Sequence, residues 1–152
     1  MGSSEAEKGP RTLMALFWAQ IAVFVIILGT MLLPFLRTFV RFAFLPLMSV
    51  CFIVGLVSLI LSVRTKPTDA LKRFLTLTGA SSTGFVVSSV LHNVFYGLAT
   101  LTGDRSIVRY TMKGLEVTFF IIAVFVCPVC FIVGTVGVIV ILLRSDRRDD
   151  TK

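Results

Sequence analysis

The stretch FLTLTGASSTGFVVSSVLHNVFYGLATL, Phe74–Leu101, decides the fold, because no Asp, Glu, Lys or Arg interrupts it over 28 residues. An α-helix rises about 1.5 Å per residue, so about 20 residues cross the roughly 30 Å of hydrocarbon in a bilayer. Three other stretches are also long, apolar and uncharged: residues 13–36, 42–63 and 117–143. The sequence therefore predicts an all-α integral membrane protein, a bundle of four transmembrane helices.

The composition of the chain agrees with a membrane protein. Of its 152 residues, 56% are hydrophobic, which leaves too few polar side chains to cover a soluble globule. We expect one membrane domain over residues 13–143, preceded by a polar lead (1–12) and followed by a charged tail (144–152). The net charge is +7, but the basic residues are spread over separate segments. We therefore expect them to face phospholipid headgroups of the bilayer, and we expect no nucleic-acid partner.

The distribution of Lys and Arg predicts the orientation. Ten of them lie in the amino-terminal lead, the second loop and the tail, whereas five lie in the first and third loops. Cytoplasmic segments carry the excess of positive charge, so both termini are predicted to be cytoplasmic. We expect a multi-pass protein of the plasma membrane.

The third loop, residues 102–116, has a helical pattern of its own. Arg105, Arg109 and Lys113 recur every four residues. The apolar residues Val108, Met112 and Leu115 recur at i, i+4 and i+7 over the same segment. This pattern predicts a short amphipathic helix at the outer membrane interface before the fourth span, with Asp104 as its N-cap and Gly114 at its end.

Small and polar residues indicate which helices pack together. The third span is the most polar of the four, so we expect it to be the central helix, away from lipid. Its candidates for polar packing or for lining a path are Ser81, Ser82, Thr83, Ser88, Ser89 and Asn93. The small residues expected at close helix contacts are Gly55, Ser58, Gly79, Gly84 and Gly134.

An identical hexapeptide, Val-Cys-Phe-Ile-Val-Gly, occurs at 50–55 in the second span and at 129–134 in the fourth. Both spans run in the same direction, so a duplicated hairpin would give parallel repeats related by an axis along the membrane normal. Duplication and coincidence both remain open, because the first and third spans do not align.

His92 is the single histidine and lies inside a span, where an ionisable residue is a functional candidate. One interpretation is a neutral imidazole that hydrogen-bonds across the bundle. The other is a haem ligand, which requires a second axial ligand from Met48 or from His92 of another copy.

The segment Cys127-Pro128-Val129-Cys130 is the second chemical candidate. Two cysteines at i and i+3 on a helix are close enough for a disulfide. Apolar surroundings suppress the reactive thiolate, however, and Pro128 has a structural role in kinking the helix. Cys51, Cys127, Cys130 and His92 are predicted at similar depths, where they would offer soft ligands to a metal such as copper(I).

The spans contain no carboxylate for a proton relay, and no pairing of nucleophile with base is recognisable. We therefore expect a non-enzymatic structural or accessory subunit, without cofactor or metal, that packs with itself or with a larger membrane complex. The alternatives are a membrane thiol or cofactor redox protein that uses Cys127, Cys130 and His92, and a small pore or transport protein lined by the third span.

Overall fold

The computed structural model describes residues 3–32, 44–64, 69–102 and 107–149, and these residues form helices with no strand among them. The elements are α1 (Ser3–Leu32), α3 (Phe44–Arg64), α4 (Asp69–Leu101), α5 (Ile107–Ile121), the π-helix η1 (Ile122–Val126) and α6 (Cys127–Asp149). Four segments are long and apolar enough to cross a membrane: Thr12–Thr30, Leu45–Arg64, Asp69–Leu101 and Ile107–Arg144. The prediction of an all-α membrane protein with four spans is confirmed.

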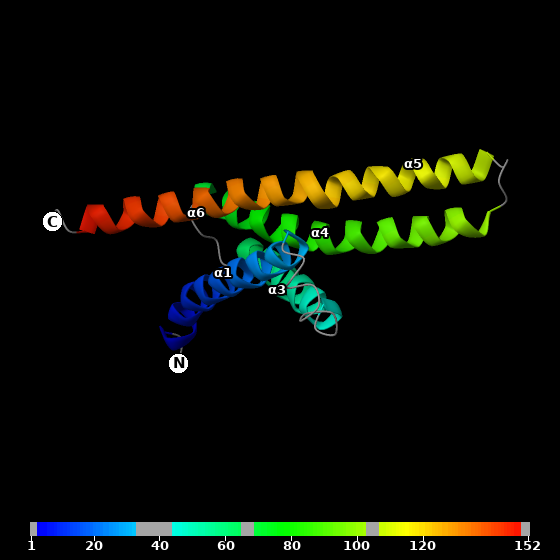
Figure 1. Cartoon of the computed structure of the whole chain (residues 1–152). Coiled ribbons are helices and arrows are strands. Elements are labelled where there is room, and N and C mark those ends of the chain that lie inside the picture. Colours follow the sequence, from blue (N-terminus) through cyan, green and yellow to red (C-terminus); the bar gives the residue numbers. More distant parts are fainter. Residues whose placement is uncertain (1–2, 33–43, 65–68, 103–106, 150–152) are drawn as a thin grey trace.

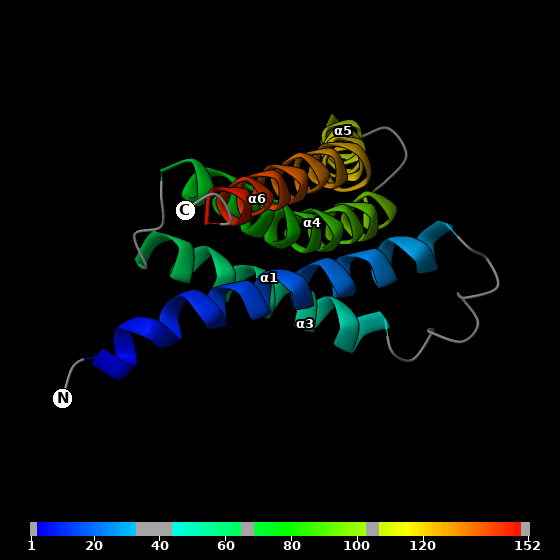
Figure 2. The ribbon, with the colours of Figure 1, turned by 90° about the vertical axis from the view of Figure 1, so that its left-hand side faces the viewer.

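The four long helices form two antiparallel pairs. In Figure 1, α4 lies side by side with the continuous helix α5–η1–α6, and in Figure 2, α1 and α3 lie against each other. The α1–α3 pair crosses the first pair obliquely, so the carboxyl-terminal part of α4 and the beginning of α5 extend beyond it (Figure 1). Helix α4 contacts α1, α3, α5, η1 and α6, which confirms its predicted place as the central helix. The expectation that all of α4 lies away from lipid is wrong, because its carboxyl-terminal half is exposed at Val90, Tyr96 and Leu101, beyond the reach of α1 and α3.

The fourth span begins much earlier than expected. The predicted helix end at Gly114 is wrong, because α5 passes through this glycine and continues through η1 into α6 (Figure 1). One glycine within a helix costs only about 1 kcal/mol. Packing against α4 offsets that cost, since the rings of Phe95 and Phe119 stack with centroids 5.5 Å apart. The segment 107–116 is therefore the beginning of a long helix, and the expected N-cap Asp104 lies outside the described residues.

Both ends of the chain contain more helix than the sequence predicted. Helix α1 begins at Ser3, within the expected polar lead, and α6 ends at Asp149, within the expected charged tail.

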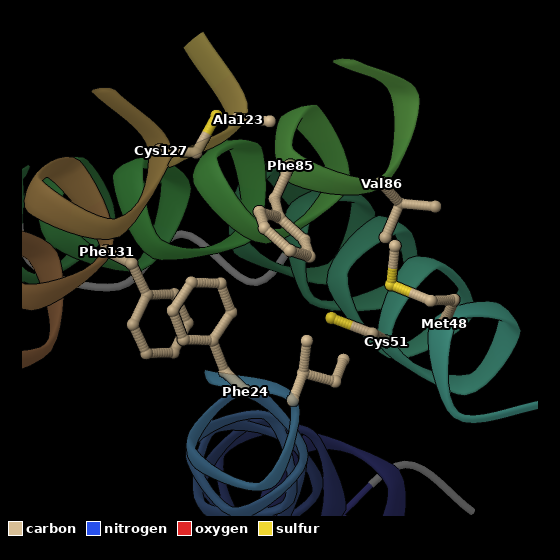
Figure 3. Close-up of a cluster of buried hydrophobic side chains, with 9 residues drawn as sticks. Phe24, Met48, Cys51, Phe85, Val86, Ala123, Cys127 and Phe131 are labelled. Atoms are coloured by element: carbon tan, nitrogen blue, oxygen red, sulfur yellow. The ribbon is translucent and has the colours of Figure 1, made fainter. Parts of the chain in front are cut away.

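Two apolar clusters form the core where the helix pairs cross. The first is centred on Phe24, Phe85 and Phe131, and the rings of Phe24 and Phe131 stack with centroids 3.9 Å apart (Figure 3). The second cluster consists of Leu13, Phe17, Leu75 and Val138. Each cluster contains residues of both helix pairs, so the clusters hold the two pairs together.

Candidate functional site

A buried glutamine connects the two helix pairs. Gln20 of α1 is 1% exposed, and its Nε2 donates to the carbonyl oxygen of Thr78 at 2.9 Å and to Ser82 Oγ at 2.7 Å. Hydrogen bonds between helices fix the register of membrane bundles, because lipid supplies no hydrophobic force to do so. Sequence reasoning missed Gln20, although an amide within an otherwise apolar span was the signal that would have found it.

The α3–α4 seam is a close contact of small residues. A β-carbon on Gly55 would overlap Ser82 Oγ and lie 2.8 Å from Thr83 Oγ1, and one on Gly79 would lie 3.1 Å from the Gly55 carbonyl oxygen. The glycines therefore let the two backbones approach each other. Ser62 Oγ and Thr76 Oγ1 add a hydrogen bond of 3.1 Å farther along the seam.

Two hydroxyl groups near this seam are buried without a hydrogen-bond partner, Ser58 Oγ and Thr83 Oγ1. Ser82, in contrast, takes part in two hydrogen bonds, since its Oγ accepts from Gln20 Nε2 at 2.7 Å and donates to the Gly79 carbonyl oxygen at 3.5 Å. The predicted small-residue positions Ser58 and Gly79 are thus buried between α3 and α4.

The α4–α6 seam uses the second copy of the repeated hexapeptide. A β-carbon on Gly134 would overlap Thr78 Oγ1 and lie 3.0 Å from the Thr78 backbone nitrogen. Gly55 and Gly134 hold the same place in the two hexapeptides, and each packs against α4. The repeat therefore corresponds to two similar glycine contacts on one central helix.

Gly84 makes a looser contact than the other packing glycines. A β-carbon there would meet only Cys127 Sγ, at the ordinary van der Waals distance of 3.5 Å.

The Cys-x-x-Cys segment follows the π-helix. Cys127 is buried and Cys130 is half-buried, and all three cysteines are free thiols. Pro128 has no N–H, and its ring would clash with the carbonyl four residues earlier in a regular α-helix. The wide turns of η1 directly precede it, and Cys127 N–H donates to the carbonyl oxygen of Ile122, five residues back. The wide turn therefore accommodates Pro128 within a continuous helix.

The thiols of the two cysteine-containing helices are separated. Cys51 and Cys127 belong to the same apolar cluster, but in Figure 3 Cys51 lies beside Met48 on one side of the Phe85 ring and Cys127 lies on the other. Within the described residues, no three His, Cys, Asp or Glu side chains converge as they would around a metal ion.

His92 makes a hydrogen bond within the longer helix pair. Its Nδ1 lies 3.1 Å from the backbone carbonyl oxygen of Glu116, which requires the Nδ1–H tautomer to donate. The imidazole also lies against the ring of Phe120, with centroids 5.3 Å apart. His92 thus joins α4 to α5 in the part of the pair that α1 and α3 do not reach.

The other polar candidates on α4 do not form one continuous line. Ser81 and Ser89 donate to carbonyl oxygens one turn back on their own helix, those of Leu77 at 2.6 Å and Phe85 at 2.8 Å. Ser88 is buried, whereas Asn93 is exposed and donates to the Ser89 carbonyl oxygen at 2.8 Å. These residues point to at least two sides of the helix.

Comparison of the chain with protein-family models, curated proteins and solved structures finds no match.

Proposed function

We propose that this protein is a non-enzymatic membrane scaffold that associates with a second copy of itself through the outer part of α4. The observation that carries the proposal is Asn93, a side-chain amide exposed on a membrane-spanning helix. One N–H of this amide donates to the Ser89 carbonyl oxygen of its own helix, which leaves a second N–H and the Oδ1 acceptor to be satisfied. Leaving amide groups unsatisfied in hydrocarbon is costly, and amides on two membrane helices can satisfy each other.

The surface around Asn93 continues the face that α3 covers. At 100° per residue, Gly79, Val86, Val90, Asn93 and Gly97 fall on one side of α4. The inner members are packed, since Gly79 contacts α3 and Val86 lies in the cluster with Met48. The outer members are open: Val90 is 56% exposed, and a β-carbon on Gly97 would have nothing within 4 Å. We call Val90, Asn93 and Gly97 the outer face of α4.

The outer face suits a second copy of the same chain. An asparagine side chain both donates and accepts, so two symmetry-related Asn93 side chains are complementary. Gly97 allows another backbone to approach closely, as Gly79 does within the molecule. No charged residue lies between Phe74 and Leu101, so two copies bring no like charges together.

The orientation and location belong to the same proposal. The ten-to-five distribution of Lys and Arg supports cytoplasmic termini in a plasma membrane. In that orientation the first turns of α5, with Arg109 and Lys113, reach the outer headgroup region, and the charged ends of α3, α4 and α6 face the cytoplasm.

Two alternatives have less support from the contacts. A thiol redox function requires an accessible cysteine pair, whereas Cys127 is buried against α4. A pore requires polar groups along one open line, whereas Ser81 and Ser89 are bonded to carbonyl oxygens of their own helix.

Disulfide crosslinking tests the proposed contact. In a background with Cys51, Cys127 and Cys130 replaced by Ala, Asn93→Cys is expected to give a covalent dimer in membranes under mild oxidation. Val94→Cys is the control, because Val94 is 48% exposed and only about 1.5 Å farther along the helix, but lies about 100° around it. Equal crosslinking at both positions would mean random collision and would contradict the proposal.

A mass measurement on the chain with its native cysteines provides a second test. Light scattering in detergent is expected to give a dimer for the native chain and a monomer for Asn93→Leu. A native chain that is monomeric in mild detergent, and that also gives no Asn93→Cys dimer in membranes, would overturn the self-association.

A further inference from the structure

A shallow, open groove lies along the surface of α4 at the end where the charged residues meet the apolar span. It has a volume of about 620 Å³ and is lined by Asp69, Lys72, Arg73, Thr76, Leu77 and Ala80. These residues recur at helical spacing, so they form one strip of α4. We call this strip the basic groove.

The basic groove is distinct from the other surfaces of α4. Its centre lies about 90° around the helix from the α3 seam at Gly79, and farther from the α6 seam, where Gly134 packs against Thr78. Thr76 borders the α3 seam through its hydrogen bond to Ser62. The outer face with Asn93 lies on another side of α4, farther along the helix.

The chemistry of the basic groove changes along its length. Lys72 and Arg73 lie at the level where the apolar stretch begins, and Asp69 leaves the strip with one net positive charge. Leu77 and Ala80 follow, within the membrane-spanning part. From Arg73 to Ala80 the helix rises about 10 Å, which reaches from the headgroup level into the hydrocarbon.

We propose that the basic groove binds one anionic phospholipid, such as a phosphatidylglycerol. Lys72 and Arg73 hold the phosphate through charge-assisted hydrogen bonds, and the first part of an acyl chain lies along Leu77 and Ala80. A basic pair directly above an apolar strip matches a lipid, which carries negative charge and hydrocarbon in that same order.

Native mass spectrometry of the detergent-solubilised chain tests this proposal with phosphatidylglycerol and phosphatidylcholine as probes. The native chain is expected to retain one phosphatidylglycerol in preference to phosphatidylcholine. Lys72→Gln/Arg73→Gln is expected to weaken retention about 30-fold, from about 5-fold for each basic residue at the membrane surface. The matched control is Arg64→Gln/Arg144→Gln, which removes the same charge from the exposed ends of α3 and α6. Equal weakening in both double variants would overturn the proposal.

A change in the apolar part separates a lipid from a free phosphate. Ala80 is exposed, so Ala80→Trp fills the strip without changing any charge, and Ala80→Leu does so with less bulk. Both variants are expected to retain less phosphatidylglycerol than the native chain, with the larger loss for Ala80→Trp. Excess inorganic phosphate is expected not to compete with phosphatidylglycerol for the native chain. Unchanged lipid retention in both variants, or full competition by inorganic phosphate, would show a phosphate site only and would overturn the lipid assignment.

The same measurement on Asn93→Leu distinguishes this proposal from the proposed scaffold function. Lipid retention is expected to be unchanged in that variant, because the basic groove and the outer face lie on different sides of α4. Loss of lipid together with loss of the dimer would place the lipid between two copies and contradict a site on α4 alone.

Discussion

Gln20 shows how much one polar side chain determines in this molecule. Its amide joins α1 to Thr78 and Ser82 of α4, and Ser82 Oγ lies directly against Gly55 of α3. Three helices therefore meet at one small group of polar atoms that lies among apolar neighbours. Because apolar side chains can slide past one another in lipid, such hydrogen bonds select one register.

The glycines of α3 and α4 differ in how tightly they are packed, which leads to a matched pair of variants. Gly55→Ala places a methyl group against Ser82 and Thr83 and is expected to destabilise the protein by about 1–3 kcal/mol, as overpacking does. Gly84→Ala is expected to be close to neutral, because its β-carbon has room beside Cys127. Thermal unfolding in detergent measures the stability of both variants. A larger loss of stability for Gly84→Ala than for Gly55→Ala would show that the α3–α4 seam is packed less tightly than the contact of Gly84 with Cys127.

The three cysteines are expected to behave as packing residues. After denaturation under acid quench the protein should show three free thiols, and in the folded state Cys130 should react with maleimide before the buried Cys51 and Cys127. A quinone should oxidise them only slowly. Rapid and reversible loss of two thiols, absent in Cys127→Ser, would instead support the redox alternative.

At the scale of single elements, η1 is the unusual feature. Across η1 and the start of α6, the buried residues Ala123, Cys127 and Phe131 are each four residues apart. Farther along α6, Phe131 and Gly134 are three residues apart, and Gly134 and Val138 are four residues apart. A π-helical turn accommodates one more residue than an α-helical turn. The wide turn thus keeps α5 and α6 facing the same helix, α4, on either side of Pro128.

This interpretation predicts that η1 tolerates a deletion. Removing Phe125, which is 61% exposed, should turn η1 into regular α-helix while α5 and α6 keep their contacts with α4. Removing Val133, which is 51% exposed within regular α6, should rotate everything beyond it by about 100° and displace Val138 from the core. Folded yield and melting temperature in detergent compare the two, and equal damage would contradict the explanation of the π-helix.

At the scale of the whole molecule, the two helix pairs differ in apolar length. The uncharged part of α3 spans about 30 Å, whereas that of α4, from Phe74 to Leu101, spans about 42 Å. A longer apolar helix fits the same bilayer by tilting. The oblique crossing of the pairs in Figure 1 agrees with a larger tilt of α4 than of α3 if both span one membrane.

The proposed orientation predicts which sites are accessible from outside. In the cysteine-free background, Thr111→Cys on α5 is expected to react with a membrane-impermeant maleimide in intact cells, since Thr111 is exposed. Tags at Met1 and Lys152 should stay protected until the membrane is opened. Labelling of either terminus in sealed cells would reverse the orientation.

The amino-acid sequence by itself determined the class of protein, the number of spans and the central place of α4. These follow from long uncharged stretches and from the density of small and polar residues, which are local properties of the chain. The sequence also contained the repeated hexapeptide, but only the tertiary structure showed that Gly55 and Gly134 pack against the same helix.

Only the tertiary structure could decide which polar residues meet. The role of Gln20, the separation of Cys51 from Cys127, the hydrogen bond of His92 and the basic groove all depend on the rotation of helices about their axes. The continuation of α5 beyond Gly114 likewise depends on its packing against α4. In a chain whose spans are apolar on nearly every side, local pattern does not specify that rotation, so contacts between helices decide it.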